Sequence, residues 1–507
     1  MVKEEQHGPA SVLQRPSTNL NDWNGPDDLD NPRNFSLLRR TCSTIAVTFL
    51  AFVSTLAASI YSPGHDQVSR AFGVSDEVAI LPLSLYNFGL AFGPLAGSPL
   101  SETFGRKAVF LTTTPLFALF ILGAGLSQSV ASLIICRFFA GVFASPAISC
   151  ASATIVDYTA GRYRAVSLAF YYSIPFFGAV FGPLLGGVIL ENKSWRWTQW
   201  VTLFFITAFF IPILFTRETY KKTILQRRAR KLSVAGPAQD TRSILASIKH
   251  FSTTLLIRPI HMVITEPIVT LVCLYNGFLF GLMYTFVVAS PWVYQHYYGF
   301  DLTAQSLSFL GLMAGTAFAP APLILIDLKL YQPRLKHFRA THSDDESFPP
   351  EHRLYPSMIA SFALPAFLFL FAWTSRPDIH WMAPIVFQGL TIMSTVLIYS
   401  SANLFMVDAY GPLYGASAAG AAMLSRCRVG EHTPRLLYPS YGAYTLALLA
   451  FWRSTEGEDE VRDSGLRLVI PDTLMIFSSN LLREFAMSKL IWEHPTMRLP
   501  ALIPWWQ

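Results

Sequence analysis

Gly178-Ala-Val-Phe-Gly182-Pro183-Leu-Leu-Gly186-Gly187 is the stretch of sequence that decides how this chain folds. It lies inside residues 165–190, a run of apolar and small side chains that contains no charge. A run of this length suits a helix that spans a bilayer, which needs about 20 apolar residues. Glycine and proline are unfavourable in most helices, but membrane helices tolerate them where a neighbouring helix approaches closely or where a bend is needed. The four-residue spacing of Gly178, Gly182 and Gly186 therefore predicts a smooth stripe on one face of a membrane helix.

The composition excludes an ordinary soluble domain. Of the 507 residues, 52% are hydrophobic and 14% are charged, whereas soluble chains are about a quarter charged. The charges cluster and leave uncharged windows that are long enough to cross a membrane. Six windows precede a polar gap and four follow it: residues 41–64, 78–101, 108–136, 138–156, 165–190, 197–216, 267–300, 302–326, 354–375 and 379–407. The sequence thus predicts an all-α polytopic membrane protein.

The distribution of basic residues predicts the orientation in the membrane. If the helices alternate and the N-terminus is cytoplasmic, the inside segments up to residue 407 hold 24 Lys and Arg and the outside segments hold 4. This bias follows the positive-inside rule. The net charge of +6 is therefore explained by topology rather than by binding to nucleic acid. The 5 cysteines are scattered, which predicts neither a disulfide framework nor a metal site, and no cofactor is expected.

The polar gap divides the chain into two helical bundles. We expect a disordered cytoplasmic tail over residues 1–40, an N-terminal six-helix bundle over 41–216, a basic cytoplasmic loop over 217–265 and a C-terminal bundle with helices 7–11 over 266–425. The basic loop is either a solvated linker or lies against anionic lipid headgroups. Residues 426–507 are more highly charged and form an atypical C-terminal region, which leaves the second bundle incomplete or aberrant. Either the chain ends in an unusual tail, or the reading frame departs from the ancestral one near residue 426.

Several motifs occur in an order that is typical of one transporter family. Residues 98–107 read Ser-Pro-Leu-Ser-Glu-Thr-Phe-Gly-Arg-Lys after the second window, and a degenerate acid–base copy at 327–331 follows the eighth. Leu133, Arg137 and Gly141 repeat every four residues at the start of the fourth helix, and residues 217–220 read Arg-Glu-Thr-Tyr. With these motifs, over roughly residues 20–425, the chain resembles the major facilitator superfamily and, within it, the fungal drug:proton antiporters with twelve helices.

The resemblance implies two six-helix bundles in a monomer that exchanges protons for a small molecule across the lipid bilayer. It also assigns an antiporter motif to helix five, formed by Gly178, Gly182, Pro183, Gly186 and Gly187.

The resemblance further implies proton-coupling and gating roles near the cytoplasmic surface. Glu102, Gly105 and Arg106 belong to the signature loop between helices two and three, where acid–base pairing can hold one conformation. Arg137 is the one fixed charge well inside a predicted span, so we expect it to face a polar interior. No Asp or Glu lies within the uncharged windows. Asp157, at the inner end of helix four, is therefore the first candidate for the carboxylate that exchanges the proton, and Glu102 is the second.

The substrate site is expected between the bundles near the membrane midplane. Aromatic side chains with a few amides suit flat, amphiphilic or cationic organic molecules. The candidates are Tyr86, Asn87, Tyr171, Tyr172, Phe176, Tyr275, Asn276, Tyr284 and Asn403. The alternative for each aromatic residue is a position against lipid or in a packing seam.

Together these patterns predict a secondary active transporter that exports hydrophobic or amphiphilic small molecules, such as drugs, toxins or secondary metabolites, in exchange for protons. Two alternatives keep the fold: a metabolite or polyamine transporter, and a non-functional remnant with a truncated second bundle. The sequence has no metalloprotease, nucleophile-elbow or phosphate-binding-loop motif, so no enzymatic activity is expected. We expect a plasma-membrane location with a cytoplasmic N-terminus, and the vacuolar membrane is the alternative.

Overall fold

The computed structural model describes residues 22–25, 27–159, 162–232, 261, 265–341 and 348–431, and these residues are predominantly helical. The first half contains η1 (Pro32–Asn34), α1 (Leu37–Ser59), η2 (Ser62–Gly64), α2 (His65–Phe72), α3 (Asp76–Phe104), α4 (Arg106–Gly125), α5 (Val130–Tyr158), α6 (Arg162–Asn192), α7 (Arg196–Phe215) and α8 (Lys221–Leu232). The second half contains α11 (Pro267–Tyr298), α12 (Leu302–Leu307), α13 (Phe309–Phe318), α14 (Pro320–Ile326), η4 (Asp327–Tyr331), α15 (Gln332–Thr341), η5 (Pro350–Leu354), α16 (Tyr355–Thr374) and α17 (Met382–Glu431).

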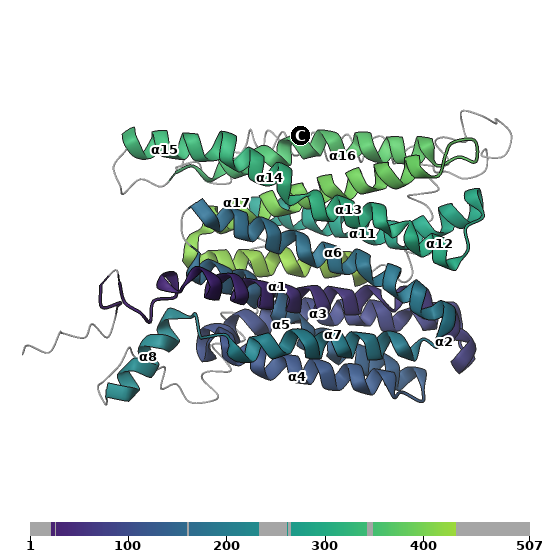
Figure 1. Cartoon of the computed structure of the whole chain (residues 1–507), viewed down its shortest axis with the longest axis horizontal. Coiled ribbons are helices and arrows are strands. Elements are labelled where there is room, and N and C mark those ends of the chain that lie inside the picture. The colour runs from purple at the N-terminus through teal and green to yellow at the C-terminus, as the bar shows by residue number, and fades with distance from the viewer. Residues whose placement is uncertain are drawn as a thin grey trace, which may run out of the picture.

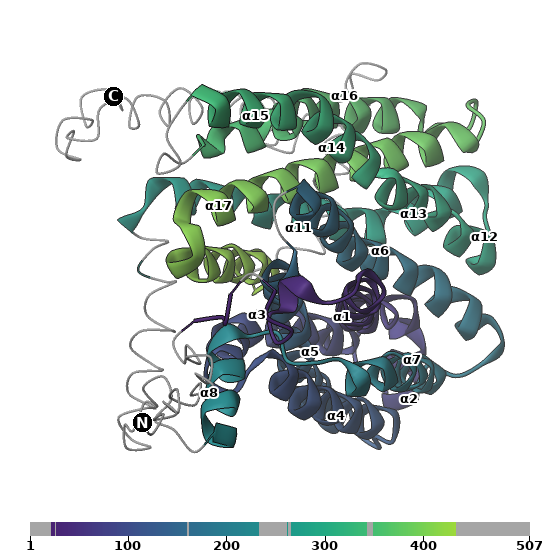
Figure 2. The ribbon, with the colours of Figure 1, turned by 60° about the vertical axis from the view of Figure 1, so that its left-hand side comes forward.

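The long helices run side by side along the longest axis of the molecule (Figure 1). Within the described residues, nine helical segments are long and apolar enough to cross a membrane. α3 has 29 residues and packs among them, against α5. α1, α3, α4, α5 and α7 gather on one side and α13 to α16 on the other, with α6 between them (Figures 1 and 2). The structure confirms the predicted all-α polytopic architecture.

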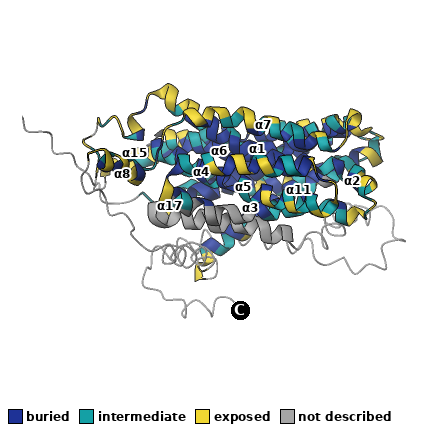
Figure 3. Ribbon diagram, turned by 90° about the horizontal axis from the view of Figure 1, so that it is seen from below, coloured by how far each residue is buried: buried dark blue, intermediate teal, exposed yellow. Residues whose placement is uncertain are grey.

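The surface of the bundle has the character of a protein that lies in lipid. Buried residues follow the inner faces of the helices, and exposed residues lie on the outer faces and at the ends (Figure 3). Large apolar side chains project outward, and Phe204, Phe318 and Phe362 are 66%, 68% and 65% exposed. Such patches are unfavourable in water, but in a membrane they contact acyl chains.

Short polar side chains and glycines set several of the helix ends. Ser36 and Ser129 accept hydrogen bonds from backbone N–H groups in the first turns of α1 and α5, and Asp301 does the same for α12 at 2.9 Å. Gly299, at φ +66°, ends α11 in the left-handed conformation. α6 continues through Pro183, which lies inside the helix as the sequence predicts.

The glycine stripe of α6 lies against α1 rather than against lipid. A Cβ at Gly178 would lie 2.6 Å from the carbonyl oxygen of Phe52, and one at Gly186 would lie 2.5 Å from that of Ile60. At Gly182, a Cβ would lie 2.7 Å from the backbone nitrogen of Ile60. Any larger side chain would push the two backbones apart, so the stripe fixes the close approach of α1 and α6.

Three helix boundaries differ from the sequence expectation. The window 108–136 holds parts of two helices, because α4 ends at Gly125 and the turn before α5 is polar but uncharged. The helix of window 302–326 does not end at residue 326, since α14 continues through η4 into α15. α17 extends to Glu431 rather than breaking near residue 426, and residues 432–507 lie outside the described part of the chain.

The described part of the N-terminal segment contacts α8 through ion pairs. Arg228 of α8 pairs with Asp28 at 2.8 Å and with Asp30 at 2.7 Å, and Lys221 pairs with Asp22 at 2.6 Å. Acids in the N-terminal segment therefore meet the bases of a helix about 200 residues further along the chain. Residues 1–21 lie outside the described part of the chain.

Candidate functional site

Arg137 is fully buried in α5, with a side chain that is 0% exposed. Its Nη1 donates to the carbonyl of Ala57 at 2.8 Å, and its Nη2 donates to that of Ala58 at 3.4 Å. These carbonyls belong to the last turn of α1, where helix carbonyls lack intrahelical partners and carry the negative end of the helix dipole. The guanidinium also lies 5.2 Å from the ring centroid of Tyr61 and 4.7 Å from that of Tyr86. Carbonyls and aromatic faces thus hold this cation, and it forms no salt bridge to another described residue.

Arg106 and Asp157 meet at one end of the first bundle, where Nε of Arg106 lies 3.4 Å from Oδ2 of Asp157. The same carboxylate oxygen accepts a hydrogen bond from the hydroxyl of Thr219 at 3.1 Å. Arg106 also donates to the hydroxyl of Ser101 and lies over the ring of Tyr220 at 5.0 Å. α3, α4, α5 and the segment after α7 are therefore joined around one ion pair.

Glu102 is the second candidate for proton exchange. Its backbone lies in α3, but its side chain lies outside the described part of the structure.

Glu218, a residue that the sequence analysis did not select, caps the N-terminus of α4. Its Oε1 accepts the backbone N–H of Arg106 at 2.9 Å, and its Oε2 accepts that of Lys107 at 3.2 Å. The N–H groups of Thr219 and Tyr220 also donate to Oε1, each at 3.0 Å. A carboxylate at this place satisfies free N–H groups of the first helical turn and complements the helix dipole. The only sequence signal for Glu218 was the Arg-Glu-Thr-Tyr motif, which indicated no partner.

Gly105 is required by this cap. Its φ of +98° is rarely adopted by other residues, and a Cβ here would lie 2.4 Å from Oε2 of Glu218. The signature glycine therefore permits both the sharp turn between α3 and α4 and the approach of the capping carboxylate.

A second charge cluster lies at the corresponding end of the other half. Arg353 pairs with Asp327 and with Asp408, each at 2.8 Å, and its guanidinium lies 3.7 Å from the ring centroid of Tyr331. Asp408 also lies 3.9 Å from Arg164 of α6, so this cluster connects the two halves. The sequence analysis noted the acid–base copy that contains Asp327, and it did not identify Arg353, Asp408 or Arg164.

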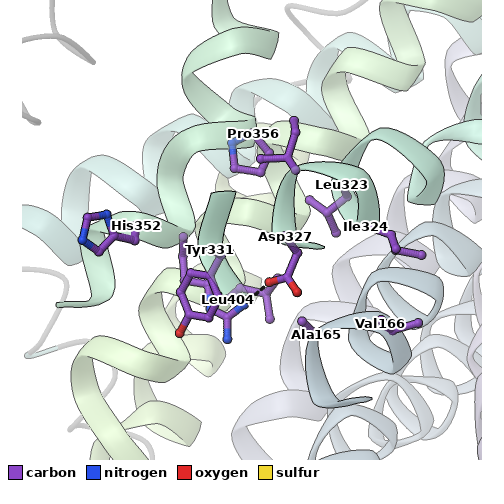
Figure 4. Close-up of a pocket in the computed structure, with 11 residues that line it drawn as sticks. Ala165, Val166, Leu323, Ile324, Asp327, Tyr331, His352, Pro356 and Leu404 are labelled. Carbon is purple, nitrogen blue, oxygen red and sulfur yellow. Dashed lines mark hydrogen bonds and ion pairs between the residues drawn. The ribbon is translucent and has the colours of Figure 1, made fainter. Parts of the chain in front are cut away.

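A pocket opens beside this cluster, between α6 and the second half (Figure 4). Ala165 and Val166 of α6 form one wall, and Leu323, Asp327 and Tyr331 face them. This pocket thus has largely apolar walls with a charge cluster at one edge.

The two halves also meet at the other end of α6. A Cβ at Gly187 would overlap the side chain of Ser306 in α12, and Oε2 of Glu191 accepts a hydrogen bond from Thr303 at 2.5 Å. Unlike the three glycines of the stripe, Gly187 therefore faces the second half. Contacts between the halves thus exist at both ends of α6.

Several of the predicted cavity residues lie between the halves. Tyr284 of α11 donates to the amide oxygen of Asn87 in α3 at 3.0 Å. Phe176 of α6 packs against Phe280 and Tyr399, with ring centroids 4.7 Å and 5.0 Å away. Tyr172 contacts Tyr399 at 5.8 Å. We call Tyr172, Phe176, Phe280 and Tyr399 the aromatic cluster, of which the sequence analysis did not select Phe280 and Tyr399.

The other predicted cavity residues make contacts within their own halves. Tyr86 stacks on Arg137, and Tyr171 donates to the carbonyl of Ile148. Tyr275 lies 3.5 Å from the hydroxyl of Ser361, and Asn403 donates to the carbonyl of Tyr399 at 2.7 Å. Asn276 is 0% exposed, and neither atom of its amide group has a hydrogen-bond partner among the described residues.

Comparison with known proteins agrees with this architecture. The family model described as Major Facilitator Superfamily matches residues 47–430. "MFS-type transporter traF" of Penicillium crustosum is 34% identical over 83% of this chain and 84% of its own length. "Polyamine transporter 4" of Saccharomyces cerevisiae is 33% identical over 80% and 64%, and "Efflux pump FUB11" of Gibberella moniliformis is 32% identical over 82% and 70%. The solved structure of the proton:xylose symporter XylE, at 13% identity, shares the fold with a TM-score of 0.57 over 83% of this chain and 96% of its own.

Proposed function

This chain belongs to the Major Facilitator Superfamily, and we propose that it exports hydrophobic or amphiphilic small molecules from the cytoplasm in exchange for protons. Membership makes it a multi-pass secondary transporter and not an enzyme. Its similarity to fungal efflux pumps supports export, and the aromatic cluster between the halves is the observation that carries the substrate class.

The aromatic cluster suits a flat, largely apolar ligand. All four of its side chains are nearly buried, and they come from α6, α11 and α17, so separating the halves would expose ring faces from both sides. Ring faces bind aromatic and cationic groups by stacking and cation–π contact. The amide of Asn87 and the hydroxyl of Tyr284 add polar partners next to them, which suits an amphiphilic molecule.

We propose Asp157 as the carboxylate that exchanges the proton. In its ionised form it is held by Arg106 and by the hydroxyl of Thr219. Protonation removes the negative charge and so weakens the pairing that joins α5 to α4 and to the segment after α7. Arg137 lies in the same helix α5 as a buried cation, and we propose that its positive charge takes part in proton coupling.

We propose that the contacts between the halves at the two ends of α6 open in alternation. Arg164 and Asp408 hold the halves together at the cytoplasmic end, and Glu191 with Thr303 does so at the outer end. Transport requires one of these contacts to open while the other stays closed, which is the rocking of two bundles about a central site. In this proposal, the N-terminus, α8 and the Arg106–Asp157 pair face the cytoplasm of a plasma-membrane protein.

The test is efflux of a flat cationic dye from a pump-deficient fungal host that produces the full-length chain. We expect efflux above that of a host with the empty vector, and we expect a protonophore to abolish the difference. Efflux that persists unchanged in the protonophore would contradict proton coupling. Absence of efflux for every flat or amphiphilic dye, with the chain present in the membrane, would contradict the substrate class.

A second candidate function is polyamine transport, because a relative named as a polyamine transporter is 33% identical. Polyamines carry several positive charges and favour carboxylates at their site. The aromatic cluster contains no carboxylate, which favours amphiphilic substrates. Spermidine can be added outside the cells or loaded into them, at concentrations that leave the membrane potential unchanged. Inhibition of dye efflux by spermidine would favour the polyamine alternative.

A further inference from the structure

A basic pocket lies at the cytoplasmic end of the first bundle, away from the boundary between the halves. It is formed by α8, the N-terminal segment and the start of α4, and Figure 2 shows α8 beside that end of the bundle. Five cations line it, against two carboxylates from Asp30 and Glu218. The cations are Lys107, Arg217, Arg227, Arg228 and Lys231.

The two carboxylates of the basic pocket are already occupied. Glu218 accepts hydrogen bonds from four backbone N–H groups at the start of α4 and in its own loop. Asp30 pairs with Arg228 at 2.7 Å, and Asp28 pairs with the same guanidinium at 2.8 Å. These acids are therefore not available to neutralise the remaining cations.

The remaining cations keep their charge uncompensated within the described structure. Nζ of Lys107 donates to the carbonyls of Leu214 and Thr216 at 2.8 and 2.7 Å, and both of these acceptors are neutral. Arg217, Arg227 and Lys231 are exposed and form no ion pair with another described residue. Like charges gathered around one hollow repel each other, which disfavours the arrangement unless an anion balances it.

The geometry of α8 directs its cations into one place. Arg227 and Arg228 lie four and three residues before Lys231, so all three side chains lie on one side of the helix. The same helix buries Thr223, Leu225 and Ala229 against the protein, which fixes its rotation. Cations that served only the positive-inside rule would not need to share a face. Lys222 and Arg230 of the same helix are exposed and do not line the basic pocket.

The place of the basic pocket decides which anion can reach it. Lys107 begins α4 and contacts the C-terminal end of α7, so the pocket lies where two membrane helices meet the cytoplasm. Anionic headgroups accumulate at this level of a cytoplasmic leaflet. Arginine forks and lysine ammonium groups are the usual partners of phosphate oxygens.

We propose that the basic pocket binds a phosphate group that carries net negative charge, supplied either by an anionic lipid headgroup or by a free phosphorylated solute. Arg227 and Lys231 bind it, while Arg228 holds the N-terminal segment in place as one wall. Because Lys107 belongs to the signature loop and Glu218 caps α4, the occupied pocket would stabilise the turn between α3 and α4.

The experiment compares two double variants of the full-length chain, each of which removes two positive charges from α8. Arg227→Gln/Lys231→Gln removes cations of the basic pocket, and Lys222→Gln/Arg230→Gln is the matched control. Purified protein in a neutral detergent is titrated with dioctanoyl phosphatidic acid, dioctanoyl phosphatidylcholine and inorganic phosphate, and binding is followed by thermal stabilisation and native mass spectrometry. We expect the pocket variant to bind phosphatidic acid roughly 30-fold more weakly, since each cation contributes about 1 kcal/mol. The control variant should stay within about two-fold of the original chain, because its cations lie outside the pocket.

The ligand arms distinguish the two sources of phosphate. Binding of phosphatidic acid without binding of inorganic phosphate identifies a lipid headgroup site, and comparable binding of both identifies a site for free phosphate compounds. Either result supports the proposal if phosphatidylcholine, which has no net charge, binds more weakly. The proposal is overturned if no phosphate compound binds, or if both double variants lose binding equally, since net charge alone would then explain the effect.

Discussion

The carboxylate of Glu218 accepts the backbone N–H of Arg106 at 2.9 Å, although 112 residues separate them along the chain. This contact places the segment after α7 against the first turn of α4, next to the Arg106–Asp157 pair. A helix cap thus connects the signature loop to the segment that follows α7. Events in either region should therefore affect the other.

The cap predicts an unusual cost for any side chain at residue 105. Gly105→Ala combines a φ of +98° with a Cβ 2.4 Å from Glu218. Gly73→Ala is the matched control, because Gly73 has a φ of +63° but nothing within 4 Å of its Cβ position. We expect Gly105→Ala to be about 1–2 kcal/mol more destabilising than the control, measured by thermal unfolding in detergent. Equal losses in both variants would show that the contact with Glu218 is unimportant.

Arg137 should not be replaceable by lysine. A lysine keeps the charge but lacks the planar group that reaches the carbonyls of Ala57 and Ala58 while lying between two tyrosine rings. We expect Arg137→Lys to lower the initial rate of protonophore-sensitive efflux roughly ten-fold, since the lost contacts are worth about 1–2 kcal/mol. The measurement is dye efflux normalised to protein in the membrane. A rate equal to that of the original chain would remove Arg137 from the mechanism.

Asp408 should control access to the pocket between α6 and the second half. Asp408→Asn weakens the contact with Arg164 across the halves and the pairing with Arg353. We expect a several-fold faster alkylation of a single cysteine at residue 166, which lines that pocket. The side chains of Arg164 and Asp408 are only partly buried, so their ion pair contributes up to about 1 kcal/mol, which corresponds to a several-fold change in rate. Asp378→Asn, at an exposed acid outside the charge clusters, is the control and should leave alkylation unchanged.

The aromatic cluster should determine substrate preference. Phe176→Leu replaces an aromatic ring, which contacts Phe280 and Tyr399 across the halves, with a smaller aliphatic side chain. Phe205→Leu makes the same change at a ring that packs against Phe52 and Phe209 inside the first bundle. We expect Phe176→Leu to raise KM for flat aromatic substrates several-fold, because a stacked ring contact is worth about 0.5–1.5 kcal/mol, with a smaller change for Phe205→Leu. Identical KM changes in the two variants would argue against a substrate role for the cluster.

The contact between the N-terminal segment and α8 should be lost only in acid. Burial by itself would raise the pKa of Asp28, but the N–H groups of Asn24 and Asp30 and the guanidinium of Arg228 outweigh this effect and lower the pKa below the ordinary 3.8. A lowered pKa stabilises the docked segment fully above the ordinary value, and this stabilisation is lost as the pH falls through the lower, docked-state value. Hydrogen exchange in residues 27–36, corrected for its intrinsic pH dependence, should therefore show constant protection from pH 5 to 8. Loss of protection between pH 6 and 5 would indicate that another group controls docking.

Hydropathy and motif order were sufficient to predict the helices and the family. Windows such as 165–190 coincide with single helices, and the glycine spacing of α6 anticipated a close helix contact, which α1 supplies. The same signals did not place the turn at 126–129, because its sequence, Leu-Ser-Gln-Ser, contains no charge. They also ended a window at residue 326, where the chain remains helical.

What the sequence by itself determined about this protein is the apolar character of its long helices and the family pattern, because these depend on residues that are neighbours along the chain. Only the tertiary structure decided which charges meet: Glu218 with the start of α4, Arg353 with Asp327 and Asp408, and Arg137 with two carbonyls and two rings. The physical reason is that burying a charge in lipid or protein demands a partner nearby in space. Folding supplies that partner from any part of the chain, and no local pattern indicates where it comes from.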